Sequence, residues 1–190
     1  MKIIGLTGTI GSGKDVAREI LEKKFNTVSV KLSDLLDYSS LKKRGINITR
    51  KIQQDLGDQL RQKYGTHVLA KIAIEFMKKN DNVKIIDGIR NPGEVDFLRQ
   101  KFGEDFKLIA IDAPQQIRFE RIVKRNRPTD PKNWEEFVAA DERDQGKNQP
   151  EYGQQVKKCI EMSDVVIQND GSLEEFTKKV EDAVKNLMQR

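Results

Sequence analysis

The chain has 190 residues, enough for one domain with a sizeable core, and it is 36% hydrophobic and 34% charged. The only cysteine, Cys159, excludes an internal disulfide framework, and no apolar run approaches the roughly 20 residues that a membrane span needs. The net charge of +5 suits an anionic partner, but with 6% aromatic residues and no basic tail we expect no nucleic-acid partner.

Five short runs of apolar, β-branched residues predict β-strands, at Lys2–Thr7, Thr27–Lys31, Val83–Asp87, Lys107–Asp112 and Asp164–Gln168. Amphipathic patterns between and after them predict helices, at Val16–Lys23, Ile52–Tyr64, Val68–Lys79, Gly93–Phe102, Pro114–Lys124 and Leu173–Met188. Alternating β and α units indicate an α/β fold, with a doubly wound, mostly parallel sheet that carries helices on both faces. We expect residues 1–190 to form a single domain.

The segment from residue 126 to residue 153 is the least regular part of the chain. It is polar and rich in proline and glycine around one short helical pattern, Trp134–Asp144. Such an insertion is either a plain surface excursion or a mobile lid. We expect Trp134 to anchor its short helix by packing, and Cys159 to be a small buried residue on a helix.

The first strand leads directly into a glycine-rich turn, Gly8–Gly13, followed by Lys14 at the start of a helix. Glycines allow successive backbone N–H groups to point at phosphate oxygens, the helix N-terminus adds positive potential, and the lysine reaches the β- and γ-phosphates. The motif predicts a nucleotide-binding P-loop whose contacts come from Gly8, Thr9, Ile10, Gly11, Ser12, Gly13, Lys14, Asp15 and Val16.

Asp15 departs from the usual P-loop pattern, in which a serine or threonine after the lysine holds Mg²⁺. A carboxylate is a good oxygen ligand for Mg²⁺, so Asp15 is a candidate metal ligand. The alternative is an acidic residue in a first helical turn, stabilised by the helix macrodipole.

Three further segments carry a family resemblance: Asp87-Gly-Ile-Arg90-x-Pro-x-Glu94, the helical pattern from Thr49 to Arg61 with Arg50 and Gln54, and the loop 168–172. Together with the P-loop they resemble the P-loop nucleoside and nucleotide kinases over residues 2–183. The chain is similar to deoxynucleoside monophosphate kinases, in which Asp after the lysine recurs, and to dephospho-CoA kinases. The resemblance implies the three-layer P-loop NTPase fold, with ATP and Mg²⁺ as cofactors.

The resemblance also implies roles for individual residues. Lys14 and Asp87 would be catalytic, and Asp87 would share the metal with Asp15. The loop Asn169, Asp170 and Gly171 would lie against the adenine of ATP. The acceptor would be bound by Ser33, Asp34, Arg50, Gln54, Arg61 and Arg90. Solvated helix charges are the alternative for Arg50 and Arg61.

Four arginines lie within ten residues, in the predicted helix Pro114–Lys124 and at the start of the polar insertion: Arg118, Arg121, Arg125 and Arg127. Planar guanidinium donors neutralise the charge of a migrating phosphoryl group. We expect Arg121, Arg125 and Arg127 to be catalytic, with Arg143 as a further lid candidate. A salt-bridged surface helix is the alternative.

The sequence therefore predicts a cytoplasmic kinase, monomeric or homodimeric, that moves the γ-phosphoryl group of Mg·ATP to a small acceptor. The favoured acceptor is a (deoxy)nucleoside 5′-monophosphate. Two alternatives stay open: a dephospho-CoA kinase, and a regulatory nucleotide-binding protein without transfer activity.

Overall fold

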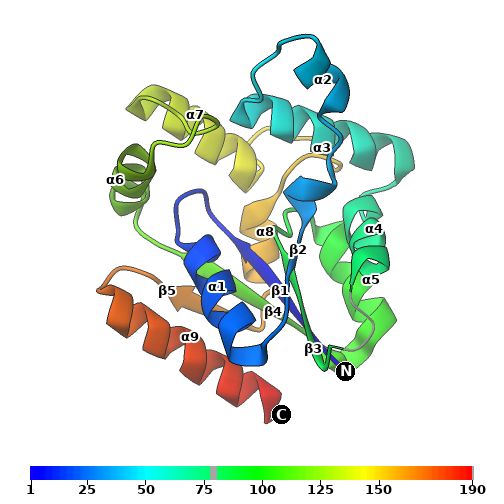
Figure 1. The fold of residues 1–190 in the computed structure, drawn as a ribbon, viewed down its shortest axis with the longest axis vertical. Helices are drawn as coiled ribbons and strands as arrows, with labels where there is room; N and C mark the ends of the chain where they lie inside the picture. The colour runs from blue at the N-terminus through cyan, green and yellow to red at the C-terminus, as the bar shows by residue number, and fades with distance from the viewer. Residues whose placement is uncertain (78–80, 190) are drawn as a thin grey trace.

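The computed structural model describes residues 1–77 and 81–189 (Figure 1). In chain order its elements are β1 (Lys2–Gly8), α1 (Lys14–Phe25), β2 (Val30–Lys31), the 3-10 helix η1 (Leu32–Leu35), α2 (Ser39–Lys43), α3 (Arg50–Tyr64), α4 (Val68–Phe76), β3 (Val83–Asp87), α5 (Pro92–Phe102), the 3-10 helix η2 (Gly103–Asp105), β4 (Phe106–Asp112), α6 (Gln115–Arg125), α7 (Trp134–Gln145), α8 (Val156–Glu161), β5 (Val165–Gln168) and α9 (Leu173–Met188).

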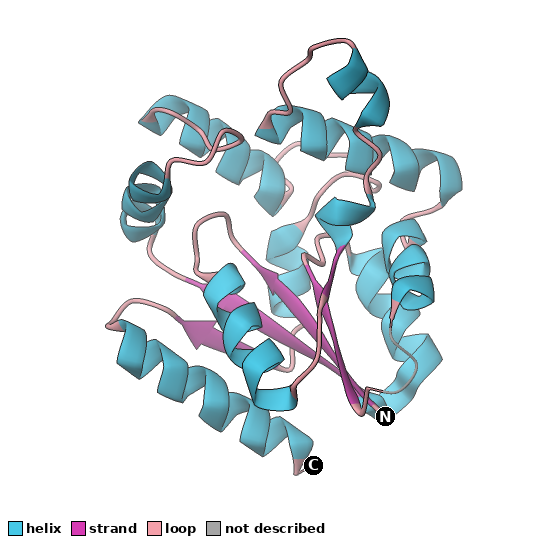
Figure 2. Cartoon of the chain, in the orientation of Figure 1, coloured by secondary structure: helices cyan, strands magenta, loops and turns pink. Residues whose placement is uncertain are grey.

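The five strands form one sheet in the order β2-β3-β1-β4-β5, and every neighbouring pair is parallel (Figure 2). The predicted sheet is confirmed, and it is wholly rather than mostly parallel. Parallel pairing brings the carboxyl ends of all the strands to one edge, where ligands bind in sheets of this kind. Lys31, Leu6 and Asp87 lie level at that edge, because Asp87 pairs in register with both of the others.

Alternate residues of the central strands enter two separate cores, so the sheet is the middle of three layers. Ile3 packs with buried side chains of α4, α5 and α8, while its neighbour Ile4 packs with buried side chains of α1 and α9. Cys159, fully buried on α8, belongs to the first core, as predicted. Of the described helices, none is long and apolar enough to cross a membrane.

The predicted strand Thr27–Lys31 is mostly wrong, because only Val30 and Lys31 pair with β3. Thr27 donates its hydroxyl hydrogen to Asp81 at 2.6 Å instead, and Val28 is 61% exposed. The pattern also missed η1, α2, η2 and α8, which are too short for an amphipathic period to appear. The predicted helix Val68–Lys79 is described as far as Phe76, and residues 78 and 79 lie outside the described residues.

The polar insertion contains the expected short helix, α7, packed against α6 rather than standing free. Phe137 of α7 is fully buried in a small core with Ile10 and Ile122. Trp134 anchors the helix as predicted, since its ring meets Phe119 edge to face with centroids 5.1 Å apart. In this structure α7 is therefore packed against the body of the molecule.

Candidate functional site

The turn between β1 and α1 forms the predicted phosphate cradle. Gly8, Gly11 and Gly13 all have positive φ angles, of 149°, 80° and 100°, which side chains rarely allow. A Cβ atom at Gly13 would lie 2.2 Å from Nδ2 of Asn169, so glycine is required there for space as well. The Asn169 amide donates to the carbonyl of Ser12 at 2.8 Å, which fixes the loop from the end of β5.

Lys14 and Asp87 face each other at the carboxyl edge of the sheet. Lys14 Nζ lies 3.7 Å from Asp87 Oδ1, and Arg18 Nε lies 3.7 Å from Asp87 Oδ2. Asp87 is 4% exposed. Within residues 1–77 and 81–189, Asp87 Oδ1 and the Ser12 hydroxyl oxygen are buried without a hydrogen-bond partner. Buried polar atoms are nearly always partnered, so both atoms are suited to a polar ligand in the cradle.

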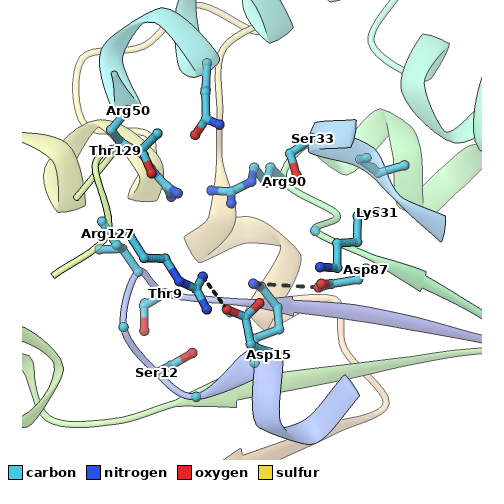
Figure 3. A pocket seen from close by; sticks show the side chains of 18 of the residues that line it. Thr9, Ser12, Asp15, Lys31, Ser33, Arg50, Asp87, Arg90, Arg127 and Thr129 are labelled. Carbon is cyan, nitrogen blue, oxygen red and sulfur yellow. Dashed lines mark hydrogen bonds and ion pairs between the residues drawn. The ribbon is translucent and has the colours of Figure 1, made fainter. Parts of the chain in front are cut away.

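Asp15 lies at the mouth of the cradle and accepts a hydrogen bond from Arg127 Nη1 at 2.7 Å (Figure 3). Burial raises the pKa of Asp15, but the charge of Lys14 and the bond to Arg127 outweigh it and lower the pKa to about 2. The carboxylate is therefore ionised at neutral pH. An Mg²⁺ ion that used Asp15 as a direct ligand would compete with Arg127 for it.

A magnesium site with few protein ligands fits these residues. The described part of the chain holds no group of three or more His, Cys, Asp or Glu side chains that could bind a metal. Mg²⁺ beside a nucleotide commonly takes only one or two carboxylates, with water and phosphate oxygens as its other ligands. Asp15 and Asp87 are the predicted carboxylates; both line the cavity, and Asp87 Oδ1 accepts no hydrogen bond from the described residues.

The arginines of α6 separate into different environments. Arg118 is buried, donates to both carboxylate oxygens of Asp141 at 2.5 and 2.9 Å, and donates to the carbonyl of Ile10 at 3.0 Å. Arg118 therefore joins α7 to the cradle. Arg121 lies beside the cradle. It donates to the Ser12 carbonyl at 3.4 Å and to the Asn169 side-chain oxygen at 3.3 Å, both longer than the bonds of Arg118.

Arg125 is held by a carboxylate of the polar insertion. It donates two hydrogen bonds to Asp130, at 2.7 and 2.6 Å, and Asp130 also accepts from the backbone N–H of Arg127. These bonds close the turn that carries Arg127 over the cradle. In this conformation Arg125 and Arg127 each hold a carboxylate, whereas Arg121 holds only amide and carbonyl oxygens.

At the other end of the same cavity, Arg50, Gln54 and Arg90 converge on Asp144. The carboxylate of Asp144 is fully buried and accepts from Gln54 Nε2 at 2.6 Å, from Arg90 Nη1 at 2.9 Å and from Arg50. Burial raises the pKa of Asp144, but Arg50 and Arg90 lower it to about 2. We call these four residues the acceptor clamp, after the role predicted from the sequence for Arg50, Gln54 and Arg90.

Arg61 and Arg143 have partners that the sequence did not reveal. Arg61 is 2% exposed, and Glu94 accepts from its Nε at 2.9 Å and from its Nη2 at 2.8 Å. Glu94 also accepts from the backbone N–H of Arg90 at 2.8 Å, so Arg61 supports the loop that carries Arg90. Arg143 forms ion pairs with Asp55 and Asp58 of α3 and does not line the cavity, which corrects its assignment as a lid arginine.

One cavity of about 630 Å³ joins the cradle to the acceptor clamp. Of the residues predicted for the site, Asp170 and the lid candidate Arg143 are not in its lining; the carboxylate of Asp170 accepts from Lys179 of α9 at 3.1 Å. The other predicted residues, Gly8–Val16, Ser33, Asp34, Arg50, Gln54, Arg61, Asp87, Arg90, Arg121, Arg125, Arg127, Asn169 and Gly171, all line it. Figure 3 shows Arg50 and Arg90 pointing toward one another on the far side from Asp15.

Sequence reasoning missed other parts of the site. Lys31, Thr129, Asp130 and Gln154 line the cavity, and Asp144 holds the two acceptor-side arginines. Lys31 was detectable in principle, because it ends a strand beside the one that ends in Asp87. Asp144 lies inside an ordinary polar helix pattern, and no local signal marks it.

A family model described as an AAA domain matches residues 4–144. A UPF0200 protein of Thermococcus onnurineus is 33% identical over 98% of this chain and 98% of its own length, and one of Methanocaldococcus jannaschii is 32% identical over 99% and 91%. A UPF0200/UPF0201 protein of Archaeoglobus fulgidus is 33% identical, and this chain spans about half, 54%, of its length.

Among solved structures, shikimate kinase from Aquifex aeolicus superposes with a TM-score of 0.56 at 18% identity, covering 97% of this chain and 96% of that one. A gluconokinase from Sinorhizobium meliloti gives a TM-score of 0.55 at 13% identity, covering 98% and 93%. These likenesses confirm the P-loop kinase fold, whereas a specific likeness to nucleoside monophosphate or dephospho-CoA kinases is not among them. The chain is a member of the UPF0200 family, and its residues 4–144 form an AAA domain.

Proposed function

We propose that the protein is an ATP-dependent phosphotransferase that moves the γ-phosphoryl group of Mg·ATP to a small acceptor, a (deoxy)nucleoside 5′-monophosphate. The observation that carries the proposal is that one continuous cavity holds the phosphate cradle at one end and Arg50 and Arg90 at the other. A donor and an acceptor bound at these ends would meet in the middle of the cavity, beside Lys14 and Asp87. Catalysis would then consist of positioning and charge neutralisation.

On the donor side, the loop amides and Lys14 would bind the β- and γ-phosphates. The Ser12 hydroxyl has no hydrogen-bond partner among the described residues and would donate to a phosphate oxygen, whereas the carboxylate of Asp87 would face the phosphates across Mg²⁺. Mg²⁺, held by Asp15 and Asp87, would neutralise charge on the β- and γ-phosphates. Leu173 and Phe176 add apolar surface to the cavity beyond Asn169, which suits the flat base of ATP.

In the transfer step, Arg121 is the arginine whose donors are least committed. Its two hydrogen bonds, at 3.3 and 3.4 Å, go to uncharged oxygens, so an anionic phosphoryl group would displace them at little cost. Arg125 and Arg127 would contribute once they leave Asp130 and Asp15. The start of the polar insertion would have to move so that the ion pair between Arg127 and Asp15 breaks.

A second candidate is transfer to a hydroxyl group, with Asp87 as the proton acceptor. The shikimate kinase and the gluconokinase that share the fold carry names that indicate such acceptors, and the dephospho-CoA alternative belongs to the same class. Asp87 Oδ1 favours this candidate, because it is buried beside Lys14 and has no hydrogen-bond partner among the described residues. A phosphate acceptor, by contrast, needs no base at neutral pH.

The test is ADP release from Mg·ATP with a panel of acceptors: the ribo- and deoxyribonucleoside 5′-monophosphates, dephospho-CoA, shikimate and gluconate. We expect release that depends on one nucleotide acceptor and falls by about 100- to 1000-fold in Lys14→Ala. Release that depends on a hydroxyl acceptor instead would favour the second candidate. If Mg·ATP binds but none of these acceptors increases ADP release, the regulatory alternative replaces phosphotransfer.

A further inference from the structure

Asp144 joins side chains from two distant elements into one basic surface. Arg50 and Gln54 belong to α3, Arg90 belongs to the loop after β3, and the carboxylate that receives all three lies on α7. The backbone of Arg90 is fixed as well, since its N–H donates to Glu94 and its carbonyl accepts from Gln155 at 2.7 Å. The clamp is therefore built from three parts of the chain: α3, the loop after β3, and α7.

Two guanidinium groups that converge on one carboxylate oxygen would repel each other without it. Arg50 and Arg90 both donate to Oδ2 of Asp144, and the pKa of Arg50 is lowered by burial and by Arg90 but raised by Asp144. With both arginines charged and Asp144 ionised, the group keeps one net positive charge. That charge faces a cavity whose other end is the phosphate cradle.

The arginines retain donors for a ligand after Asp144 is satisfied. Each guanidinium has five N–H donors. Apart from the bonds to Asp144, no other side-chain hydrogen bond from Arg50 or Arg90 is found within residues 1–77 and 81–189, and the buried Nε of Arg50 is unpartnered there. The side chains are 19% and 17% exposed, and both line the cavity. An oxyanion between them would meet donors that are already ordered.

We propose that Asp144 is a positioning residue: it holds Arg50 and Arg90 side by side so that their remaining N–H donors bind one compact oxyanion, a phosphate or a carboxylate, of the acceptor. This proposal rests on the proposed phosphotransfer and assigns it an acceptor class. Uncharged sugars and alcohols are excluded from that class. Asp144 itself touches no substrate, because the two arginines cover it and it is fully buried.

The experiment titrates inorganic phosphate and acetate by calorimetry into protein saturated with Mg·AMP-PNP, so that the cradle is occupied. We expect the wild-type protein to bind one of the two anions, and the preferred anion identifies the acceptor group. In Asp144→Asn, which keeps the shape but loses the charge, Arg50 and Arg90 repel each other and are no longer held side by side, so the affinity should fall at least about tenfold although the net positive charge of the clamp increases. The affinity for Mg·AMP-PNP should stay unchanged.

Asp141→Asn is the matched control. Asp141 is also a fully buried ion-pair residue of α7, but its partner is Arg118, which contacts the cradle and not the clamp. It should leave anion binding intact. Equal losses of anion affinity in both variants would mean that α7 acts only as structural support, and would overturn the proposal. So would an unchanged anion affinity in Asp144→Asn, or a wild-type protein that binds neither anion.

Folding of each variant is checked by thermal unfolding, followed through the fluorescence of Trp134, the only tryptophan. If Asp144→Asn does not fold, Arg90→Lys replaces it, because an ammonium group keeps the charge but cannot bond Asp144 and the anion as a fork does. Loss of anion affinity in Arg90→Lys supports the clamp, and unchanged affinity overturns it. If Mg·AMP-PNP does not bind, the proposed function fails, while the dependence of anion binding on Asp144 still tests the clamp.

Discussion

The two ends of the cavity are built in different ways. The cradle is one short loop whose glycines, with positive φ angles, turn the backbone between β1 and α1. The acceptor clamp joins residues that are 94, 54 and 90 positions apart from Asp144 in the chain. The cradle therefore depends mainly on backbone conformation, and the clamp depends on charges that long-range packing brings together.

The largest expected effect tests whether α7 serves both ends. Asp141 accepts hydrogen bonds from Arg118, which also donates to the cradle carbonyl of Ile10. Asp144, three residues later on the same helix, belongs to the acceptor clamp. Asp141→Asn removes one charge of a buried ion pair, so we expect the free energy of unfolding to fall by about 3–5 kcal/mol, measured by urea denaturation. Glu142→Gln on the same helix removes an exposed ion pair with Lys147 and should change it by less than about 0.5 kcal/mol.

If Asp141→Asn is no more destabilising than Glu142→Gln, α7 is not the shared support of the two ends. The arrangement of the acceptor clamp would then depend on α3 and the loop after β3 alone.

Most of the fold could be predicted from the sequence because local patterns dominate it. The strands Val83–Asp87 and Lys107–Asp112 are nearly continuous apolar runs, and their pairing follows from alternation with helices. The strand predicted from Thr27 was mostly wrong, because the Thr27 hydroxyl donates to Asp81 and Val28 is exposed, and only Val30 and Lys31 pair in the sheet. Apolar pattern alone does not distinguish these uses.

The cradle was predictable because a local sequence motif determines it. The partners of the arginines were not predictable. Arg61 read as an acceptor residue, yet Glu94 occupies its guanidinium in a buried pair. Arg143 read as a lid residue, yet it binds Asp55 and Asp58. Which carboxylate an arginine meets depends on helix packing over tens of residues, and a single sequence carries no signal for that choice.

The second prediction concerns the charge at the centre of the cradle. Lys14→Ala removes the ammonium group that lies 3.7 Å from Asp87 and is expected to bind the transferring phosphate. We expect turnover to fall by about 100- to 1000-fold, as for loss of one preorganised donor. ADP release with the acceptor found in the panel measures this, and the exposed Lys71→Ala on α4 is the control. Unchanged turnover would contradict the P-loop assignment.

The third prediction tests the dependence of the cradle on backbone geometry. Gly11 has φ of 80°, and a Cβ there would lie 2.6 Å from the carbonyl oxygen of Arg118. Gly45, between α2 and α3, has φ of 69° but no atom within 4 Å of such a Cβ. We expect Gly45→Ala to cost about 1 kcal/mol from conformation alone, and Gly11→Ala to cost about 2–3 kcal/mol because α6 must also move. Equal costs in denaturant titrations would show that the close contact with α6 is unimportant.

The smallest effect concerns the ion pair that spans the mouth of the cradle. Asp15 and Arg127 are 30% and 54% exposed, so Arg127→Ala should cost only about 0.2–1 kcal/mol of stability at neutral pH. The folded-state pKa of Asp15, about 2, lies below its ordinary value of 3.8. The stabilisation is therefore complete above pH 3.8 and is lost as the pH falls toward 2. The difference between the wild-type protein and Arg127→Ala should shrink over that range and in high salt, whereas the exposed Arg44→Ala should show no such trend. If the difference is independent of both pH and salt, Arg127 stabilises the mouth by packing, and Asp15 is free to bind a metal without competition from it.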